Sequence, residues 1–383
     1  MKVFCEDTLT YGEAFFEDVA EVTHFAGNQL SAADLTDVEA LFIRSTTKVT
    51  PELLSQAKQL KLVATATAGT DHMDLNYLKE RGIKAYSAAG CNAIAVAEYV
   101  IAGLLWLAAK EKIKLHSKRL GIVGAGNVGT ALAERAEHLG LEVLLCDPPL
   151  EAAGDIRDMV PLSVILECDI ISLHVPYVNE GRWPTRHMLD EQRLKALKPE
   201  QILVNACRGE VVDNRALKSV LQSNNAFFTL FDVWENEPDI DFELAQCTDI
   251  ATQHIAGHTL EGKARGTEMI YNFAAQQFGW PQKSMWHYLP EVTFSGKSWL
   301  DLAQNESSTE VQLHELISQV YAIEQDSLLF KTQVNDDKSF RYSRKHYGIR
   351  REFSSVQVNT GNSLLTQAIY GLGFRNVAKG DQT

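Results

Sequence analysis

The segment Leu120–Asp147, which reads LGIVGAGNVGTALAERAEHLGLEVLLCD, constrains the fold more than any other stretch of the chain. A short apolar run leads into a glycine-rich turn, and a second apolar run ends at Asp147. Between them Val128, Leu132, Ala136 and Leu139 recur at helical spacing. This order predicts a strand–helix–strand unit whose first turn is built from glycine.

The glycines of this unit have separate functions. Gly124 allows the tight turn, Gly126 lets the backbone approach a pyrophosphate, and Gly129 lets the helix lie close to the strand. The helix N-terminus offers N–H groups and a partial positive charge to phosphates. Asp147, about 20 residues beyond the glycines, can accept hydrogen bonds from an adenosine ribose. A lone GxGxxG also serves ordinary turns, but the complete unit predicts dinucleotide binding, with NAD favoured because Asp147 would repel a 2′-phosphate.

Bulk properties exclude several classes of protein. The 383 residues suggest two or three domains, and the net charge of −14 argues against a nucleic-acid surface. The six cysteines are scattered without a CxxC pair, which is typical of reduced thiols in a cytoplasmic protein. The N-terminus lacks the apolar core of a signal peptide. The apolar segment Ala93–Ala109 is short for a membrane span and contains Glu98, so we expect a buried helix and no membrane association.

Strand and helix patterns alternate on both sides of the glycine-rich unit, which predicts an α/β protein with parallel sheets. Before it we expect strands at Lys2–Cys5, Ala40–Arg44, Leu62–Ala66 and Ala85–Ser87, and helices around Tyr11–Ala20, Pro51–Gln56 and Asp74–Arg81. After it we expect strands at Ile170–His174, Ile202–Asn205, Phe228–Asp232 and near Ile250, then a helix at Leu260–Phe278 that returns to the first domain. A linker to about Ser308 leads to a small α+β domain with a helix at Val311–Ile323, strands at Ser327–Phe330 and Ser355–Asn359, and a helix at Leu364–Leu372.

Three polar segments follow the predicted strands of the nucleotide domain. They read NACRG (Asn205–Gly209), DVWENEP (Asp232–Pro238) and HIAGH (His254–His258). In an open parallel sheet ligands bind beyond the carboxyl ends of the strands, so all three segments are expected at the cofactor crevice.

With the glycine-rich unit, these segments resemble the pattern of the D-2-hydroxyacid dehydrogenases over roughly the first 280 residues. The resemblance implies a Rossmann-type NAD domain, a flavodoxin-like substrate (lid) domain and a C-terminal α+β dimerisation domain. The corresponding boundaries are residues 1–92 with 258–287 for the lid, 93–257 for the NAD domain and 288–383 for the dimerisation domain.

Further motifs resemble the branch of this family that oxidises 4-phospho-D-erythronate in pyridoxal 5′-phosphate biosynthesis. They are RSTTK (Arg44–Lys48), TATAGTDHMD (Thr65–Asp74), GCNAIAVAEYV (Gly90–Val100), LLCDPP (Leu144–Pro149), HIAGH with LEGKARG, and RREFSS (Arg350–Ser355). This resemblance implies oxidation to a 2-oxo-3-hydroxy-4-phosphobutanoate with NAD, by a homodimer whose C-terminal domain forms the dimer.

The chemistry of the reaction agrees with the roles that the family implies. Removing the hydroxyl proton needs a base with a pKa near neutrality, which suits His254. Glu237, if hydrogen-bonded to the imidazole, would fix its tautomer and favour its charged form. Arg208 can hold the substrate carboxylate with two parallel hydrogen bonds.

The remaining site residues are carried over by resemblance. NAD contacts are expected at Gly124, Gly126, Asn127, Val128, Gly129, Asp147, Val175, Ala206, Cys207, Arg208, Asp232 and Gly257. Substrate contacts are expected at Arg44, Ser45, Thr67, His258 and Arg350, with Arg44, Lys48 and the pair Arg350-Arg351 considered for the phosphate. Two positions depart from the family pattern, because His258 replaces a tyrosine and Val175 replaces a hydroxyl residue, where NAD contact would be through the backbone.

Other interpretations stay open. His254 and His258 have the spacing of zinc ligands, but no cysteine or carboxylate pattern accompanies them, so no metal is expected. The same chemistry could act on another 2-hydroxy acid, such as 3-phosphoglycerate. A protein of this fold could instead be a non-enzymatic NAD(H) sensor that binds protein partners, although the acidic charge and the lack of a long disordered tail argue mildly against it.

Overall fold

The computed structural model describes the chain except for residues 28, 224–226, 296, 303–306, 362 and 378–383. Two compact units are present, one formed by residues 1–92 with 258–290 and the other by residues 93–257 with 291–383. The C-terminal segment therefore belongs to the same compact unit as the nucleotide-binding segment, and its status as a separate dimerisation domain stays a prediction. Residues 296 and 303–306 of the expected linker lie outside the described part of the chain.

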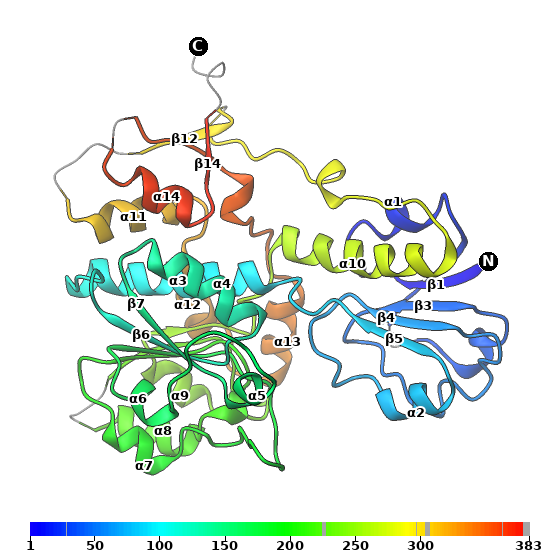
Figure 1. Ribbon diagram of the computed structural model, residues 1–383, viewed down its shortest axis with the longest axis horizontal. Coiled ribbons are helices and arrows are strands. Elements are labelled where there is room, and N and C mark those ends of the chain that lie inside the picture. The colour runs from blue at the N-terminus through cyan, green and yellow to red at the C-terminus, as the bar shows by residue number, and fades with distance from the viewer. Residues whose placement is uncertain (28, 224–226, 296, 303–306, 362, 378–383) are drawn as a thin grey trace. The chain divides into compact units, whose positions relative to one another are not determined.

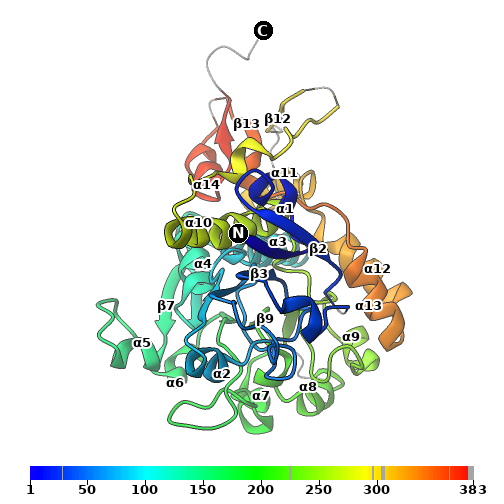
Figure 2. The same ribbon diagram turned by 90° about the vertical axis from the view of Figure 1, so that its right-hand side faces the viewer.

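The first unit contains a parallel sheet in the order β2-β1-β3-β4-β5. Its strands are β1 (Lys2–Glu6), β2 (Glu21–Phe25), β3 (Ala40–Ile43), β4 (Leu62–Thr65) and β5 (Lys84–Ser87). Its helices are α1 (Gly12–Phe16), α2 (Leu75–Glu80) and α10 (Leu260–Phe278), with 3₁₀ turns at Ala32–Leu35 and Met285–His287. Figures 1 and 2 show α1 and α10 on one face of the sheet and α2 on the other.

Both faces of this sheet are buried, as a parallel sheet requires. Val3 and Cys5 pack toward α1 and α10, whereas Phe4 packs in a second cluster with Leu78 of α2. The sequence analysis did not predict β2. This edge strand has exposed or half-buried residues, so it lacks the apolar run that indicates a strand. The expected helix at Pro51–Gln56 is wrong, because these residues form turns.

The second unit is built around a parallel sheet in the order β11-β10-β9-β8-β6-β7. Its strands are β6 (Arg119–Val123), β7 (Glu142–Cys146), β8 (Ile170–Leu173), β9 (Ile202–Asn205), β10 (Phe228–Phe231) and β11 (Ile250–Ala251). Its helices up to residue 257 are α3 (Ala93–Glu111), α4 (Asn127–Glu137), α5 (Pro148–Ala152), α6 (Leu162–Ile165), α7 (Glu191–Ala196), α8 (Asn214–Leu221) and α9 (Phe242–Cys247), with a 3₁₀ turn at Gly209–Val211.

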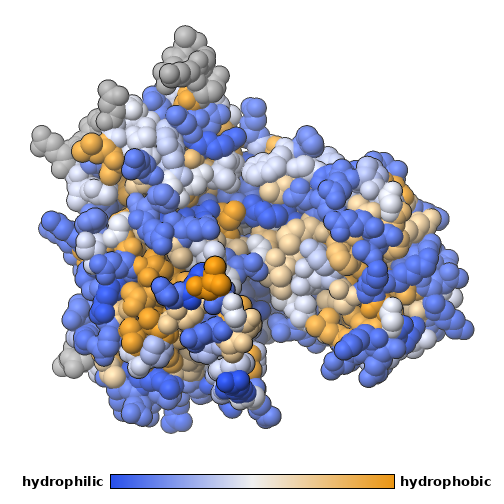
Figure 3. Space-filling view, in the orientation of Figure 1, coloured by the Kyte–Doolittle hydropathy of each residue, from blue (hydrophilic) through white to orange (hydrophobic). Residues whose placement is uncertain are grey.

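Helices cover both faces of this sheet (Figures 1 and 2). Leu120 and Ile122 pack in one cluster with α3, α4 and the C-terminal segment, and Ile171 and Leu203 pack in another with α7 and α8. Figure 3 shows hydrophobic residues at the surface where Figure 1 draws β6 and β7. There β7 is the edge strand, and its central residues are only half-buried.

The helix α3 confirms the expectation of a buried helix at Ala93–Ala109. By length and composition it could cross a membrane, but 78% of its apolar window is buried inside the structure, as in a core helix. The side chain of Glu98 is buried as well, and its carboxyl accepts a hydrogen bond from Phe353 N–H (3.0 Å). The helix is thus enclosed between the sheet and the C-terminal segment.

The C-terminal segment contains a parallel sheet in the order β12-β13-β14. Its elements are β12 (Trp299–Asp301), α11 (Thr309–Ser318), α12 (Ile323–Gln333), α13 (Asp337–Lys345), a 3₁₀ turn at Phe353–Ser355, β13 (Gln357–Asn359), α14 (Thr366–Gly371) and β14 (Arg375–Asn376). The expected strand at Ser327–Phe330 is wrong, because these residues lie in α12. Ile323, Ser327 and Phe330 are its buried residues, and their spacing of four and three is helical.

Candidate active site

The glycine-rich turn between β6 and α4 has the shape that the sequence predicts. Gly124 has a φ of +95°, and a Cβ atom there would lie 2.4 Å from the carbonyl oxygen of His174. A Cβ atom at Gly129 would lie 2.1 Å from the carbonyl oxygen of Gly124. At Gly126, the N-cap of α4, a Cβ atom would meet nothing within 4 Å. The helix N-terminus therefore faces open space and fits the phosphates of a dinucleotide.

Asp147 connects this turn to the end of β7. Its Oδ2 accepts a hydrogen bond from Ala125 N–H (2.9 Å), and its Oδ1 accepts one from Leu150 N–H (3.0 Å) as the N-cap of α5. A carboxylate has about four acceptor positions, so both oxygens can still accept from ribose hydroxyls. The side chain is half-buried beside the glycine-rich turn, where the sequence predicts it.

Other expected NAD contacts follow neighbouring strands at the same edge of the sheet. Val175 lies just beyond β8, and Ala206 and Cys207 lie just beyond β9, its neighbour. Cys207 N–H donates to Asn205 Oδ1 (3.2 Å). Burial raises the pKa of the Cys207 thiol to about 11, so this residue is a neutral thiol and not a nucleophile.

Glu237 and His254 form a direct pair, with 2.7 Å between Oε2 and Nδ1. Glu237 Oε1 accepts a second hydrogen bond from Trp234 N–H (2.9 Å). Burial raises the pKa of Glu237, but the charge and hydrogen bond of His254, the Trp234 N–H and the charge of Arg344 together hold it below its ordinary value. Glu237 is therefore an ionised acceptor, so His254 Nδ1 carries the proton and donates it. The Nε2 lone pair is left available as a base.

The backbone around His254 is fixed by hydrogen bonds to Asp232, which follows the neighbouring strand β10. His254 has a φ of +60°, a left-handed conformation that costs a non-glycine residue roughly 1 kcal/mol. Its N–H donates to the carbonyl of Asp232 (2.7 Å). The buried Asp232 carboxylate accepts from Ile255 N–H (2.7 Å) and Ala256 N–H (2.8 Å). Asp232, expected as a cofactor contact, thus shapes the loop that carries His254.

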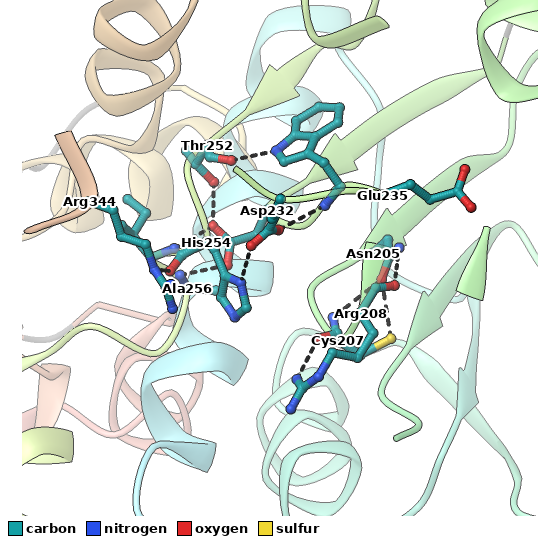
Figure 4. Close-up of polar contacts among 12 residues, drawn as sticks. Asn205, Cys207, Arg208, Asp232, Glu235, Thr252, His254, Ala256 and Arg344 are labelled. Atoms are coloured by element: carbon teal, nitrogen blue, oxygen red, sulfur yellow. Dashed lines mark hydrogen bonds and ion pairs between the residues drawn. The ribbon is translucent and has the colours of Figure 1, made fainter. Parts of the chain in front are cut away.

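Arg208 follows β9, next to the strand that leads to Glu237. Its Nη1 donates to the carbonyl of Cys207 (2.8 Å), and the side chain is half-buried. A Cβ atom at Gly209 would lie 1.9 Å from the carbonyl carbon of Trp234, so only glycine permits this approach of the two loops. In Figure 4 the side chains of Arg208 and His254 extend in the same direction.

In the first unit, expected substrate contacts lie at the carboxyl ends of paired strands. Arg44 and Ser45 follow β3 and Thr67 follows β4, and these strands are neighbours. Arg44 and Thr67 are half-buried and Ser45 is exposed. His258, which is half-buried, precedes α10 and its N-cap Thr259.

Sequence reasoning missed Glu6, which shapes the loop after β3. Its carboxylate accepts hydrogen bonds from the hydroxyls of Thr8, Thr46 and Thr47 and from Arg44 N–H. Burial raises the pKa of Glu6, but these four donors hold it below its ordinary value. The signal in the sequence was an acidic residue at the end of an apolar strand. If such a carboxylate is buried, it needs several hydrogen-bond donors from neighbouring loops.

Arg350, expected as a substrate contact, is enclosed within the second unit. Its side chain is buried, with 4% exposure, and its Nη2 donates to the carbonyls of Ala95 (2.8 Å) and Ala256. The guanidinium also lies 4.4 Å from the ring centre of Tyr321. This placement argues against the expectation that Arg350 binds substrate, because a phosphate would have to enter the core to reach it.

Potential metal ligands lie close together among the described residues. Among them, the group that places three potential ligand atoms within 4.8 Å of one another is Glu13, Glu17 and His24, which are exposed in the first unit. The six cysteines are free thiols, and Cys247 alone among them is exposed.

Comparisons with known proteins agree with this geometry. Residues 92–256 match the family model described as the NAD-binding domain of D-isomer specific 2-hydroxyacid dehydrogenases, and residues 295–373 match a domain of unknown function. A D-lactate dehydrogenase from Aquifex aeolicus, solved with NAD and lactic acid, superposes with a TM-score of 0.56 at 26% identity over 73% of this chain and 96% of that one. A protein from Thermus thermophilus gives a TM-score of 0.61 at 26% identity over 74% of this chain and 99% of that one.

The fold and the site thus define an NAD-dependent D-2-hydroxyacid dehydrogenase. Two curated relatives, both named erythronate-4-phosphate dehydrogenase, extend the similarity to nearly the full length. The one from Pseudoalteromonas atlantica is 48% identical over 98% of this chain and 99% of its own, and the one from Escherichia coli O127:H6 is 40% identical over the same shares. The chain belongs to the erythronate-4-phosphate dehydrogenase family.

Proposed function

We propose that this enzyme oxidises 4-phospho-D-erythronate at C2 to (R)-3-hydroxy-2-oxo-4-phosphobutanoate, as a step of pyridoxal 5′-phosphate biosynthesis in the cytoplasm. The full-length similarity to relatives of that name supports the substrate. The single observation that supports the chemistry is the 2.7 Å pair of an ionised Glu237 with His254, which leaves Nε2 as the base.

In the proposed reaction His254 Nε2 removes the proton of the C2 hydroxyl as the C–O bond becomes a carbonyl. NAD, held at the glycine-rich turn and Asp147, would supply the acceptor for the hydride that leaves C2. Glu237 stabilises the imidazolium that forms, and Arg208 holds the C1 carboxylate so that C2 is correctly oriented. The proton and the hydride together account for the two hydrogens that the alcohol loses.

The phosphate is proposed to bind the loop after β3. The exposed Lys48 and the half-buried Arg44 supply positive charge in a protein whose net charge is −14, and Ser45 supplies a hydroxyl donor. Thr67 and His258 are proposed as further substrate contacts. Arg350 is not part of this proposal, because its side chain is enclosed in the second unit.

The test is incubation of the purified enzyme and NAD with 4-phospho-D-erythronate or with 3-phosphoglycerate. Reduced cofactor and trapped 2-oxo acid are both measured, because slow cofactor release could hide turnover. We expect product from the erythronate at a rate well above that from 3-phosphoglycerate. A preference for 3-phosphoglycerate would overturn the proposed substrate. NAD binding without any 2-oxo acid product would indicate a non-enzymatic NAD(H) sensor.

A further inference from the structure

The C-terminal segment contacts the loop that carries the proposed base. Arg344, on α13, donates from Nε to the carbonyl of His254 (3.2 Å), as Figure 4 shows. The neighbouring Ser343 accepts a hydrogen bond from Gln253 Nε2 (2.8 Å). Arg350, beyond the same helix, donates to the carbonyl of Ala256. Three residues of a segment about 90 positions away thus bind the loop at 253, 254 and 256.

These contacts complement those from the sheet. The N–H groups of residues 254–256 are bound by Asp232, through its carbonyl and its carboxylate. The carbonyls of His254 and Ala256 are bound by Arg344 and Arg350. A left-handed residue such as His254 keeps its conformation only when its surroundings fix it, so the C-terminal donors complete what the sheet begins.

The acidic member of the pair is supported by the same segment. Phe340 of α13 packs edge-on against Phe330 of α12, with ring centres 6.0 Å apart. Phe330 stacks on Trp234, with ring centres 6.1 Å apart. The backbone N–H of Trp234 in turn donates to Glu237 Oε1. Residues of α12 and α13 therefore support both His254 and Glu237, through direct contacts or through Trp234.

We propose that Arg344 is a positioning residue for the His254–Glu237 pair, and that α12 and α13 serve the chemistry of the nucleotide-binding unit. This proposal rests on the function proposed for His254. It gives a catalytic purpose to a part of the chain that matches a domain of unknown function.

The expected effect is on kcat more than on KM. A displacement of about 1 Å in a reacting group can slow a reaction about 100-fold. Replacing Arg344 by Met keeps an unbranched side chain as far as the position of Nε but removes its donors and its charge. We expect Arg344→Met to lower kcat about 10- to 100-fold, while KM and the NAD dissociation constant change less than about threefold. Arg344→Gln retains a donor and should recover part of the loss.

Arg341→Met is the matched control, because Arg341 lies on the exposed side of the same helix. It should leave kcat within about twofold of wild type. Should Arg344→Met fold poorly, Arg344→Ala with added guanidinium ion gives a second measurement, in which the ion should restore turnover without changing NAD affinity.

A double-mutant cycle with His254→Ala separates this proposal from the one on which it rests. With His254 gone, Arg344→Met should not lower the residual rate further. An equal fold loss in both backgrounds, or wild-type kcat in Arg344→Met, would overturn the positioning role alone. Wild-type turnover in His254→Ala would instead overturn the proposed base, whatever Arg344 does.

Discussion

Among single residues, Asp147 has a structural function, and we propose that it also determines the choice of cofactor. Its carboxylate accepts N–H groups from the glycine-rich turn and from the first turn of α5, which fixes it at the carboxyl end of β7. A negative charge held in this way cannot move aside for a 2′-phosphate. We therefore propose that the contacts that shape the turn also set the preference for NAD.

We predict that Asp147→Ser narrows the preference for NAD over NADP. Serine can still cap α5 but removes the repulsion of the 2′-phosphate. The measurement is kcat/KM with each cofactor at saturating substrate. If the ratio for the variant equals that of wild type, Asp147 does not determine the choice of cofactor.

His174, which follows β8, is expected to make the stability of the protein depend on pH. Its Nε2 lies 2.8 Å from Ser172 Oγ and its Nδ1 is buried, and burial lowers the pKa of His174 to about 3. An unfolded histidine titrates near 6.5, so between these two pKa values the unfolded chain binds the extra proton. Stability is therefore lost as the pH falls below about 6.5, by roughly 2 kcal/mol at about pH 5. His174→Gln should reduce the shift of the urea midpoint between about pH 7.5 and about pH 5. The same shift in both proteins would refute this assignment.

Among the elements, α3 contains a buried acid, Glu98. Burial raises the pKa of Glu98 well above its ordinary value, and the nearby Glu352 raises it further. A neutral carboxyl at this position is closely mimicked by an amide. We predict that Glu98→Gln changes the free energy of unfolding by less than about 1 kcal/mol, whereas Glu98→Leu costs roughly 1–3 kcal/mol because Phe353 N–H loses its acceptor. Urea unfolding of both variants checks this, and equal stability of the two would contradict it.

Elements with an unambiguous pattern could be predicted to the residue. Ile202–Asn205 is a short apolar run between polar neighbours, and Leu260–Phe278 begins after the cap Thr259 and ends before Gly279. Ser327–Phe330 could not be assigned from its local pattern, because a short apolar run fits either a buried strand or a helix. Ser327–Phe330 are helical because α12 packs against the rest of the second unit, and this packing cannot be read from the local sequence.

The candidate site divides in the same way. The glycine-rich turn, Asp147 and the Glu237–His254 pair lie within motifs whose spacing reflects the sheet, so sequence alone located them. Arg344 and the buried placement of Arg350 depend on contacts with residues about 90 or more positions away. No local pattern in the sequence indicates such contacts. For this reason the surroundings of Arg344 and Arg350 could not be predicted from the residues next to them.

At the scale of the whole molecule, we propose a homodimer, since closed two-fold dimers are the commonest assemblies of soluble enzymes. Light scattering coupled to size exclusion should give about twice the chain mass of 42.6 kDa. A mass equal to that of one chain over a range of protein concentrations would contradict the proposal.

We propose that this chain transfers a hydride from C2 of 4-phospho-D-erythronate to NAD. The most direct measurement uses the substrate carrying deuterium at C2, in a single turnover with excess enzyme. We expect deuterium to appear in the reduced cofactor together with the 2-oxo acid, and His254→Ala to abolish most of both while NAD still binds. Reduced cofactor without deuterium, or no 2-oxo acid despite bound NAD and substrate, would contradict it.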